Sequence, residues 1–221
     1  MSPGGWLPIL STRVKICGLS TPETMAVALE AGADWVGLVR FPRSPRHVDL
    51  GTARALSQQA RGRAERVVLL VDPDDAEVAA AIEAIDPDLI QLHGAEAPAR
   101  VAAIRAATGR PVMKALGIAG PVDLRRIAAY SGIADRLLLD AKPPPGADLP
   151  GGNGRAFDWD LLAGADLPAG WMLSGGLDAD GVGLALARTG AEAVDVSSGV
   201  ESAPGVKDPA RIAAFVAAAR G

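Results

Sequence analysis

Two side chains that can exchange protons stand where short apolar runs of this sequence end in a turn. Cys17 closes the run VKIC just before Gly18, and Asp140 closes the run RLLLD. A thiol and a carboxyl can serve as general base and general acid when their pKa values are shifted toward the working pH. A lone cysteine is more often a small buried hydrophobic residue, but its place beside a glycine at the end of a run favours a chemical role.

A second feature is a pair of apolar runs near the C-terminus that both end in small residues. The first run ends in Ser174-Gly175-Gly176 and the second in Ser197-Ser198-Gly199, with a helical segment between them. Small residues leave backbone N–H groups bare, and bare amides beside a helix N-terminus attract an anion. The spacing predicts a phosphate site, because in eight-stranded β/α barrels the loops after strands 7 and 8 often bind phosphate.

The elements that must position these residues repeat along the chain. Apolar runs alternate with alanine-rich segments of helical spacing, several opened by a capping residue such as Thr21, Asp74 or Asp208. This alternation predicts a parallel sheet covered by helices, and eight units fit a closed barrel better than an open sheet. We expect an α/β fold, a single-domain (β/α)8 TIM barrel over residues 1–221, with an N-terminal extension at 1–12 and a long catalytic-face loop, a lid, at 141–157. The runs begin near Val14, Trp35, Val67, Leu89, Val112, Arg136, Trp171 and Ala193.

Alternation along each strand predicts which side chains face the barrel axis. In the first run Val14 and Ile16 face the helices, which turns Lys15 and Cys17 inward. Closure makes the first and last strands neighbours and a buried charge needs a partner, so we expect Lys15 to form a structural pair with Asp195. The same reasoning places further side chains inward: Gln91, His93, Lys114, Leu138 and Asp140.

His93 and Lys114 leave alternatives open. His93 can line a pocket or donate a structural hydrogen bond, and we favour the second role. Nucleophilic catalysis by Cys17 and His93 is conceivable, although strands 1 and 4 lie across a barrel from each other. An inward Lys114 would be the better rival, as a Schiff-base lysine.

The composition excludes several classes of function. The net charge of −4 and the pI of about 5.2 argue against nucleic acid as a partner. One cysteine excludes an internal disulfide, and two histidines without carboxylates at ligand spacing do not support a metal site. No apolar run reaches membrane-spanning length, and the first residues lack the basic start of a signal peptide. We therefore expect a cytoplasmic protein with no metal, nucleic acid or membrane partner.

A series of short motifs follows in a specific order along the chain. They are KICG at 15–18, QLHG at 91–94, LD at 139–140, GGNGR at 151–155, FDW at 157–159, SGGL at 174–177 and DVSSGVE at 195–201. With these motifs the chain resembles the phosphoribosylanthranilate isomerase family of tryptophan biosynthesis, from about Arg13 to the C-terminus. The resemblance implies a barrel of ribulose-phosphate-binding type and a cofactor-independent Amadori isomerisation. In that reaction N-(5-phosphoribosyl)anthranilate becomes 1-(2-carboxyphenylamino)-1-deoxyribulose 5-phosphate.

The resemblance also implies roles for individual residues. Asp140 would protonate the ring oxygen of the ribose, and Cys17 would take a proton from the adjacent sugar carbon. Asp140 must then hold its proton above a reference pKa of about 3.9, and Cys17 must ionise from about 8.5. Arg46 would bind the anthranilate carboxylate, which a planar guanidinium suits well. The phosphate would rest on the amides of Gly175, Gly176, Ser198 and Gly199, with Gly154 closing over it.

Two other functions remain open at the level of the sequence. The histidine-pathway isomerase performs the same rearrangement on another aminoaldose, but its family generally has an aspartate where this chain has Cys17. A non-catalytic sensor of phosphoribosyl ligands would need neither Cys17 nor Asp140. The chain departs from the family at Arg40-Phe41 and in LDADGV, where we expect Asp178 to cap a helix. The expected partner is a small phosphoribosyl substrate, bound by a monomer or homodimer.

Overall fold

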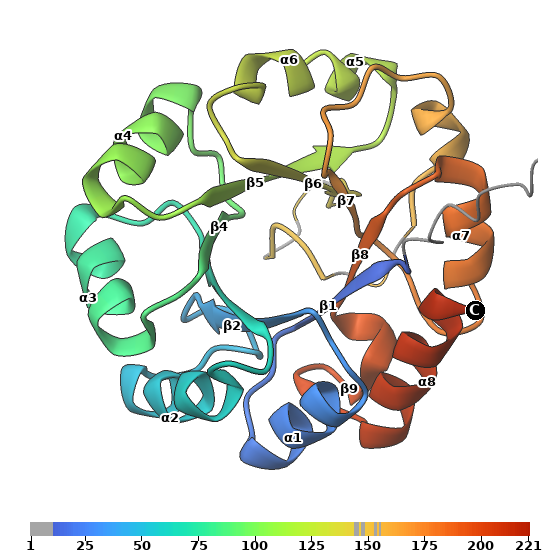
Figure 1. Ribbon diagram of the computed structural model, residues 1–221. Coiled ribbons are helices and arrows are strands. Elements are labelled where there is room, and N and C mark those ends of the chain that lie inside the picture. The colour runs from blue at the N-terminus through green and yellow to red at the C-terminus, as the bar shows by residue number, and fades with distance from the viewer. Residues whose placement is uncertain (1–10, 144–145, 147–148, 153, 155) are drawn as a thin grey trace, which may run out of the picture.

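The computed structural model describes residues 11–143, 146, 149–152, 154 and 156–221. Within them, eight parallel strands close into a barrel in sequence order, with helices around it (Figure 1). The predicted (β/α)8 fold is confirmed, and each strand begins at or close to a predicted run. Most of the predicted extension at 1–12 lies outside the described residues, as do Asn153 and Arg155. The barrel strands are β1 (Arg13–Cys17), β2 (Trp35–Arg40), β3 (Glu65–Leu70), β4 (Leu89–Leu92), β5 (Val112–Ile118), β6 (Arg136–Ala141), β7 (Met172–Leu173) and β8 (Ala193–Val196).

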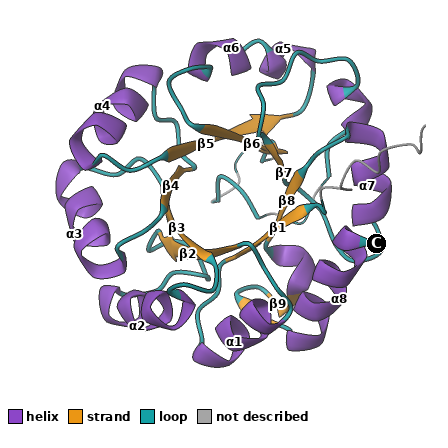
Figure 2. Cartoon of the chain, viewed as in Figure 1, coloured by secondary structure: helices purple, strands orange, loops and turns teal. Residues whose placement is uncertain are grey.

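The helices form a ring outside the strands, as the purple and orange elements of Figure 2 show. Three predicted capping residues, Thr21, Asp74 and Asp208, accept hydrogen bonds from backbone N–H groups of the first turn. Gly109 and Gly190 end their helices in the left-handed conformation that glycine favours. The helices are α1 (Pro22–Glu30), α2 (Leu50–Ala60), α3 (Asp75–Ile85), α4 (Pro98–Thr108), α5 (Pro121–Leu124), α6 (Ile127–Tyr130), α7 (Val182–Thr189) and α8 (Pro209–Arg220).

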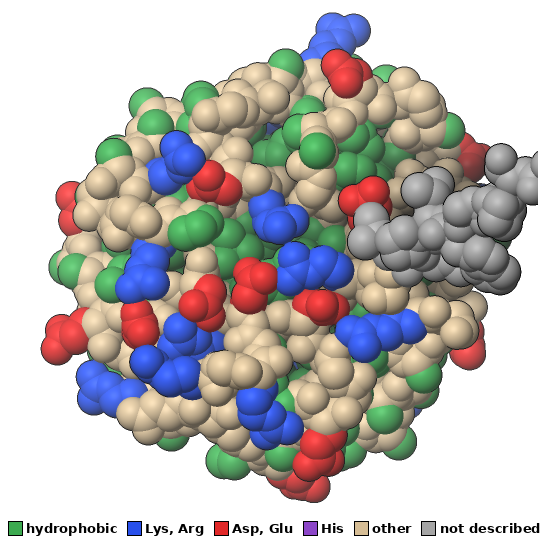
Figure 3. Space-filling model, in the orientation of Figure 1, with side chains coloured by type: hydrophobic (Ala, Val, Ile, Leu, Met, Phe, Trp, Pro, Cys, Tyr) green, Lys and Arg blue, Asp and Glu red, His purple; other side chains and the backbone are tan. Residues whose placement is uncertain are grey.

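The interior of the barrel is apolar near the N-terminal ends of the strands. Trp35 is fully buried there, with the guanidinium of Arg13 3.6 Å and that of Arg136 5.3 Å from the centre of its ring. This packing closes one end of the barrel and leaves the other end for a pocket. Figure 3 shows side chains of both charges together over the middle of one face of the molecule. The inner apolar cluster consists of Trp35, Val67, Leu89, Met113, Ala115, Leu138, Met172 and Ala193.

The predicted inward orientation of Lys114 is wrong. Lys114 is the register partner of Leu92, which packs among the helices, whereas its neighbours Met113 and Ala115 belong to the inner cluster. Its ammonium is buried outside the barrel, 2.7 Å from Oε2 of Glu96. Side chains of a strand alternate with a period of two, so an error of one residue in assigning the inner face reverses every orientation. A Schiff-base lysine at this position is therefore excluded.

Two additions lie at the C-terminal ends of the strands. The loop between β6 and β7 contains a short 3-10 helix, η1 (Trp159–Leu162). After β8 come η2 (Ser198–Val200) and a hairpin of β9 (Glu201–Ala203) and β10 (Val206–Lys207).

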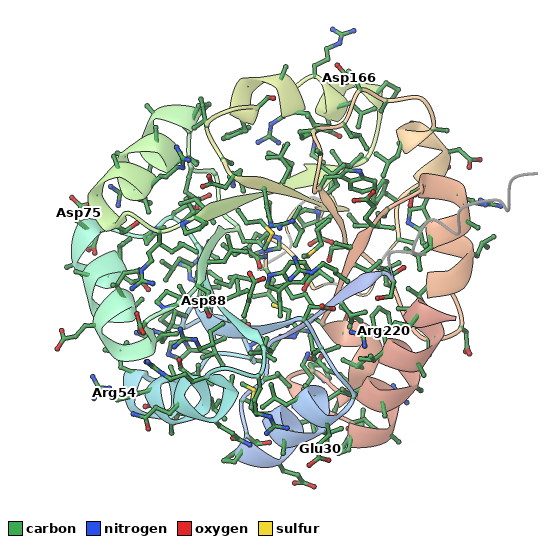
Figure 4. The ribbon with its side chains drawn as sticks, in the orientation of Figure 1. Glu30, Arg54, Asp75, Asp88, Asp166 and Arg220 are labelled. Atoms are coloured by element: carbon green, nitrogen blue, oxygen red, sulfur yellow. The ribbon has the colours of Figure 1, made fainter. Side chains whose placement is uncertain are left out.

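Charged residues such as Glu30, Asp75 and Asp166 point outward from the ring of helices (Figure 4). Among the described ranges, none of the helices combines the length and apolar character that crossing a membrane requires.

Candidate active site

A pocket opens at the C-terminal ends of the strands, where catalytic groups of β/α barrels lie. It encloses about 770 Å³ with its mouth included. The loop after β6 contributes part of its lining and crosses the middle of the barrel in Figure 1. Cys17 and Asp140 both face this pocket. The lining contains nine of the residues that were predicted as site residues: Cys17, Arg46, His93, Asp140, Gly154, Gly175, Gly176, Asp195 and Ser198.

Cys17 lies next to a buried ion pair that joins the first and last strands. Lys15 and Asp195 are register partners, and Lys15 Nζ donates to Asp195 Oδ1 over 2.7 Å, so the pair expected from barrel closure is present. The charge of the Lys15 ammonium also acts on the Cys17 thiol, an interaction that the sequence did not indicate. Burial raises the pKa of the thiol, and the Lys15 ammonium opposes this shift without cancelling it. Burial alone would lower the pKa of Lys15, but the charges of Asp195 and Cys17 raise it overall.

Asp140 is the last residue but one of β6 and lies at the pocket wall, where two nitrogen atoms contact its carboxyl group. The N–H of Ala141 donates to Oδ1 over 2.8 Å, and His93 Nε2 lies 3.2 Å from Oδ2. His93 Nδ1 lies 3.0 Å from the amide nitrogen of Gln91. With that amide nitrogen as donor, Nδ1 accepts and Nε2 carries the hydrogen that faces Asp140. His93 thus has both of the roles left open for it, because it lines the pocket and holds another side chain.

The loops after β7 and β8 lie against each other at the pocket. Gly175 and Gly176 have φ angles of 91° and 65°, a region that favours glycine. Within the described part of the chain their amides donate to no acceptor, and both residues line the pocket. A side chain on Gly199 would overlap the carbonyl oxygen of Leu177, which shows how closely the loops approach. Gly199 itself lies behind the lining, whereas Ser197 belongs to it.

Arg46 follows β2 and is buried against a carboxylate of the protein. Its Nε and Nη2 donate to Oε1 and Oε2 of Glu201 over 2.7 and 2.8 Å, and Nη2 also reaches the Gly152 carbonyl over 3.2 Å. Glu201 begins β9 and accepts a further bond from Lys207 Nζ over 2.7 Å. Two cations and one carboxylate leave a net positive charge beside the pocket, which suits an anionic ligand.

The loop after β6 approaches Asp140 and His93 closely. A Cβ atom on Gly151 would lie 2.6 Å from both Asp140 Oδ2 and His93 Nε2, so only glycine fits there without displacing them. Lys142, at the start of the loop, pairs with Asp123 of α5 over 2.8 Å. The ion pair of Lys142 ties the start of the loop to α5, and Gly151 lets a later part of the loop approach the pocket.

The chain departs from the family pattern at Arg40 and Phe41, where β2 ends, and again near Asp178, before α7. Phe41 joins an apolar part of the pocket wall, together with Val39 and Leu69. Arg40 does not line the pocket, and its Nη1 donates to the carbonyl of Val48 over 2.7 Å. Asp178 accepts from the N–H of Gly181 over 2.7 Å, in the turn before α7, but the N-cap of α7 is Gly181 and has no side-chain cap, so the expected capping of the helix by Asp178 is wrong.

Ser197, Glu201 and Lys207 were not identified as site residues from the sequence. Lys207 Nζ donates to the carbonyl of Ser197 over 2.8 Å and to Glu201, which connects all three. Glu201 ends the motif DVSSGVE, so a polar residue just beyond the last strand was the available signal. No pattern in the sequence pointed to Lys207, because the hairpin that contains it was not predicted.

Among the described residues, His, Cys, Asp and Glu side chains form no group of three that could hold a metal ion.

Known proteins resemble this chain in both sequence and structure. The family model described as N-(5'phosphoribosyl)anthranilate (PRA) isomerase matches residues 14–218. The N-(5'-phosphoribosyl)anthranilate isomerase of Azorhizobium caulinodans is 63% identical over 211 residues, which cover 96% of this chain and 92% of that protein. The crystal structure of phosphoribosyl anthranilate isomerase from Thermotoga maritima has a TM-score of 0.85 and 34% identity, covering 95% of this chain and 99% of that one. A crystal structure of the isomerase in complex with reduced 1-(o-carboxyphenylamino)-1-deoxyribulose 5-phosphate has a TM-score of 0.82 and 32% identity, with the same coverage.

Proposed function

Because this chain belongs to the N-(5'-phosphoribosyl)anthranilate isomerase family, we propose that Asp140 and Cys17 perform the proton transfers of its isomerisation. The chain is an aldose–ketose isomerase of tryptophan biosynthesis. The observation that carries the proposal is that a carboxyl and a thiol, from opposite parts of the sequence, line the same pocket. One acid and one base suffice for this rearrangement.

Asp140 acts first, as the general acid. Its proton goes to the ring oxygen of the ribose while the bond between that oxygen and C1 breaks, which leaves a protonated Schiff base with the anthranilate nitrogen. The contacts from His93 and Ala141 hold the carboxyl group in one orientation. A fixed donor reduces the entropy lost when the transition state forms.

Cys17 acts second, as the general base. The thiolate takes the proton from C2 of the sugar, and the electron pair of that C–H bond forms the double bond of an enolamine while the imine nitrogen becomes neutral. The enolamine then tautomerises to the ketone. The Lys15 ammonium beside the sulfur stabilises the thiolate. Burial raises the pKa of the thiol, so the thiolate is a stronger base once it has formed.

The charged ends of the substrate bind on either side of the reacting sugar. The open amides of Gly175 and Gly176, with Ser198 on the next loop, take the phosphate, and Gly154 and Gly199 shape the space around it. Arg46 takes the anthranilate carboxylate, and the apolar wall that includes Phe41 contacts the aromatic ring. The compound held by the related crystal structure has the same two charged ends.

The test separates chemistry from binding. Cys17→Ala and Asp140→Asn should each lower kcat by a factor on the order of 10²–10⁴, the usual contribution of a general acid or base. The Kd of the reduced product analogue should stay close to that of the unaltered chain. Turnover is followed by the fluorescence of freshly prepared N-(5'-phosphoribosyl)anthranilate, without added cofactor or metal. As a control, Asp135→Asn removes a carboxylate that pairs with Arg105 outside the pocket lining. Near-normal kcat in either active-site variant would remove that residue from the mechanism.

A further inference from the structure

Glu201 occupies a central place beside the pocket although no step of the isomerisation uses it. Its side chain is buried, with 4% of its surface exposed, and lies between two cations. Arg46 donates two parallel hydrogen bonds to its two oxygens, and Lys207 donates to Oε1 over 2.7 Å. The backbone N–H of Gly205 adds a bond to Oε2 over 3.2 Å. The carboxylate is therefore fully engaged.

A buried carboxylate beside an anion-binding pocket calls for a physical reason. Its negative charge repels any substrate anion, and its burial carries a cost in free energy that good geometry must offset. Burial favours the neutral acid, but Arg46 and Lys207 outweigh this effect and lower the pKa of Glu201, so it is ionised at neutral pH. The charge on Glu201 is thus present while the substrate binds.

The contacts show what the carboxylate does to Arg46. The bidentate pair uses the Nε and Nη2 edge of the guanidinium, which fixes the plane of the group. The adjoining edge, with Nη1 and the second hydrogen of Nη2, faces the loop after β6. There Nη2 reaches the Gly152 carbonyl, and Nη1 lies 2.7 Å from the place that a Cβ atom on Gly152 would take. Because Glu201 takes the other edge, a ligand carboxylate binds at this second edge, where it replaces the Gly152 carbonyl as the acceptor for Nη2.

We propose that Glu201 is a positioning residue, which holds the Arg46 guanidinium so that its Nη1 and Nη2 edge meets the carboxylate of the substrate. This inference rests on the proposed role of Arg46 as the carboxylate-binding residue. Lys207 offsets the charge of Glu201, so that the substrate carboxylate approaches a group of net positive charge. Glu201 acts through Arg46 and does not touch the reacting atoms.

A purely electrostatic effect of Glu201 has the opposite sign. If the carboxylate only added negative charge near the pocket, its removal would strengthen the binding of an anionic ligand. If it orients Arg46, its removal weakens binding, and only for ligands that carry the carboxylate. The sign and the selectivity therefore distinguish the two effects.

The experiment measures the Kd of two ligands by calorimetry. The first is reduced 1-(o-carboxyphenylamino)-1-deoxyribulose 5-phosphate, and the second is the same compound with a phenylamino group, which lacks the carboxylate. Glu201→Gln should raise the Kd of the first ligand about tenfold, as expected for the loss of one charge-assisted hydrogen bond, and leave that of the second unchanged. In steady-state assays the KM should rise while kcat stays nearly constant.

Two variants keep the test decisive. Glu201→Asp retains the charge and the ion pairs but is one methylene shorter, so it displaces Arg46 and should cause the same selective loss even if Glu201→Gln does not fold. Glu96→Gln is the matched control, because Glu96 is also buried in a 2.7 Å pair with a lysine, Lys114, outside the pocket. It should leave both Kd values unchanged.

Arg46→Ala separates this inference from the proposed function. It should raise the Kd of the carboxylated ligand selectively, and in its background Glu201→Gln should cause no further loss. If Arg46→Ala shows no selective loss, the assignment of Arg46 is wrong and the role of Glu201 is lost with it. If Arg46→Ala does show it but the Glu201 variants weaken both ligands equally, or tighten the carboxylated one, only the positioning role is overturned.

Discussion

At the scale of single residues, the pocket places Cys17 under two opposing influences. Burial in the barrel disfavours the thiolate, and the Lys15 ammonium favours it, while Asp195 adds a negative charge nearby. Burial is the larger effect, so the pKa of the thiol lies above its ordinary value. In the free enzyme Cys17 is therefore a protonated thiol. This form resists oxidation, because the thiolate is the reactive form.

The raised pKa predicts slow alkylation of the folded protein. The rate of reaction with iodoacetamide should reach its midpoint at a higher pH than in the urea-unfolded chain, and the readout is clean because Cys17 is the only cysteine. Stability should follow the same sign. Relative to Cys17→Ser, the free energy of unfolding should fall as the pH rises through about 8.5, the pKa of the thiol in the unfolded chain, because that thiol ionises first. A folded-state midpoint below that of the unfolded chain would mean that Lys15 outweighs burial.

At the scale of elements, the two loops after β7 and β8 work as one unit. Their glycines meet two separate needs, since Gly175 and Gly176 adopt positive φ angles and Gly199 leaves room for the carbonyl of Leu177. The proposed phosphate site therefore depends on the distance between two loops as well as on the amides within each. A change at the point of contact should alter binding without touching Cys17 or Asp140.

Gly199→Ala tests this dependence. The added methyl group must push the loop after β8 away from Leu177, which should raise the KM about tenfold and lower stability by about 1–3 kcal/mol, as overpacking usually does. The matched control is Gly183→Ala in α7, where a Cβ atom has open space. Gly183 lies in the first turn of α7, where the change should be neutral or stabilise by up to roughly 0.5–1 kcal/mol. An unchanged KM for Gly199→Ala, measured beside its control, would show that the spacing of the loops does not matter for the phosphate.

At the scale of the whole molecule, the two ends of the barrel differ. The packed N-terminal end contributes stability, and the C-terminal end contains the pocket. The N-terminal end is packed around Trp35, whose ring N–H donates to Glu65 over 2.8 Å. The guanidinium groups of Arg13 and Arg136 lie over the Trp35 ring. The C-terminal end carries the pocket, with buried charges in ion pairs. Groups that do chemistry are destabilising when buried, and the apolar layer beneath offsets part of that cost.

Substitution of Trp35 should therefore affect folding alone. Trp35→Ala should lower the free energy of unfolding by about 3–5 kcal/mol and Trp35→Phe by less, because each leaves a cavity in a packed layer. Denaturant unfolding measures the loss, and kcat and KM are measured in the absence of denaturant, where the folded fraction is known. A drop in kcat per folded molecule would show that the two ends of the barrel are coupled.

Much of this molecule follows from local patterns in its sequence. The number and order of the strands, the helix caps at Thr21 and Asp208, and the strand-end positions of Cys17 and Asp140 are confirmed by the structure. Each depends on residues a few positions apart, where hydrophobic period and capping chemistry act directly. Lys114 shows the limit of such reasoning, since a pattern of period two does not say which of its two phases faces the axis.

The sequence by itself determined the fold class, the family and the residues able to exchange protons. Tertiary structure decided which of them meet. Arg46 and Glu201 are 155 residues apart and Lys15 and Asp195 are 180 apart, and only the second pair could be inferred, because closure of the barrel makes their strands neighbours. The contact between Arg46 and Glu201 depends on the paths of two loops beyond the strands, and no repeating pattern along the chain records where those paths cross.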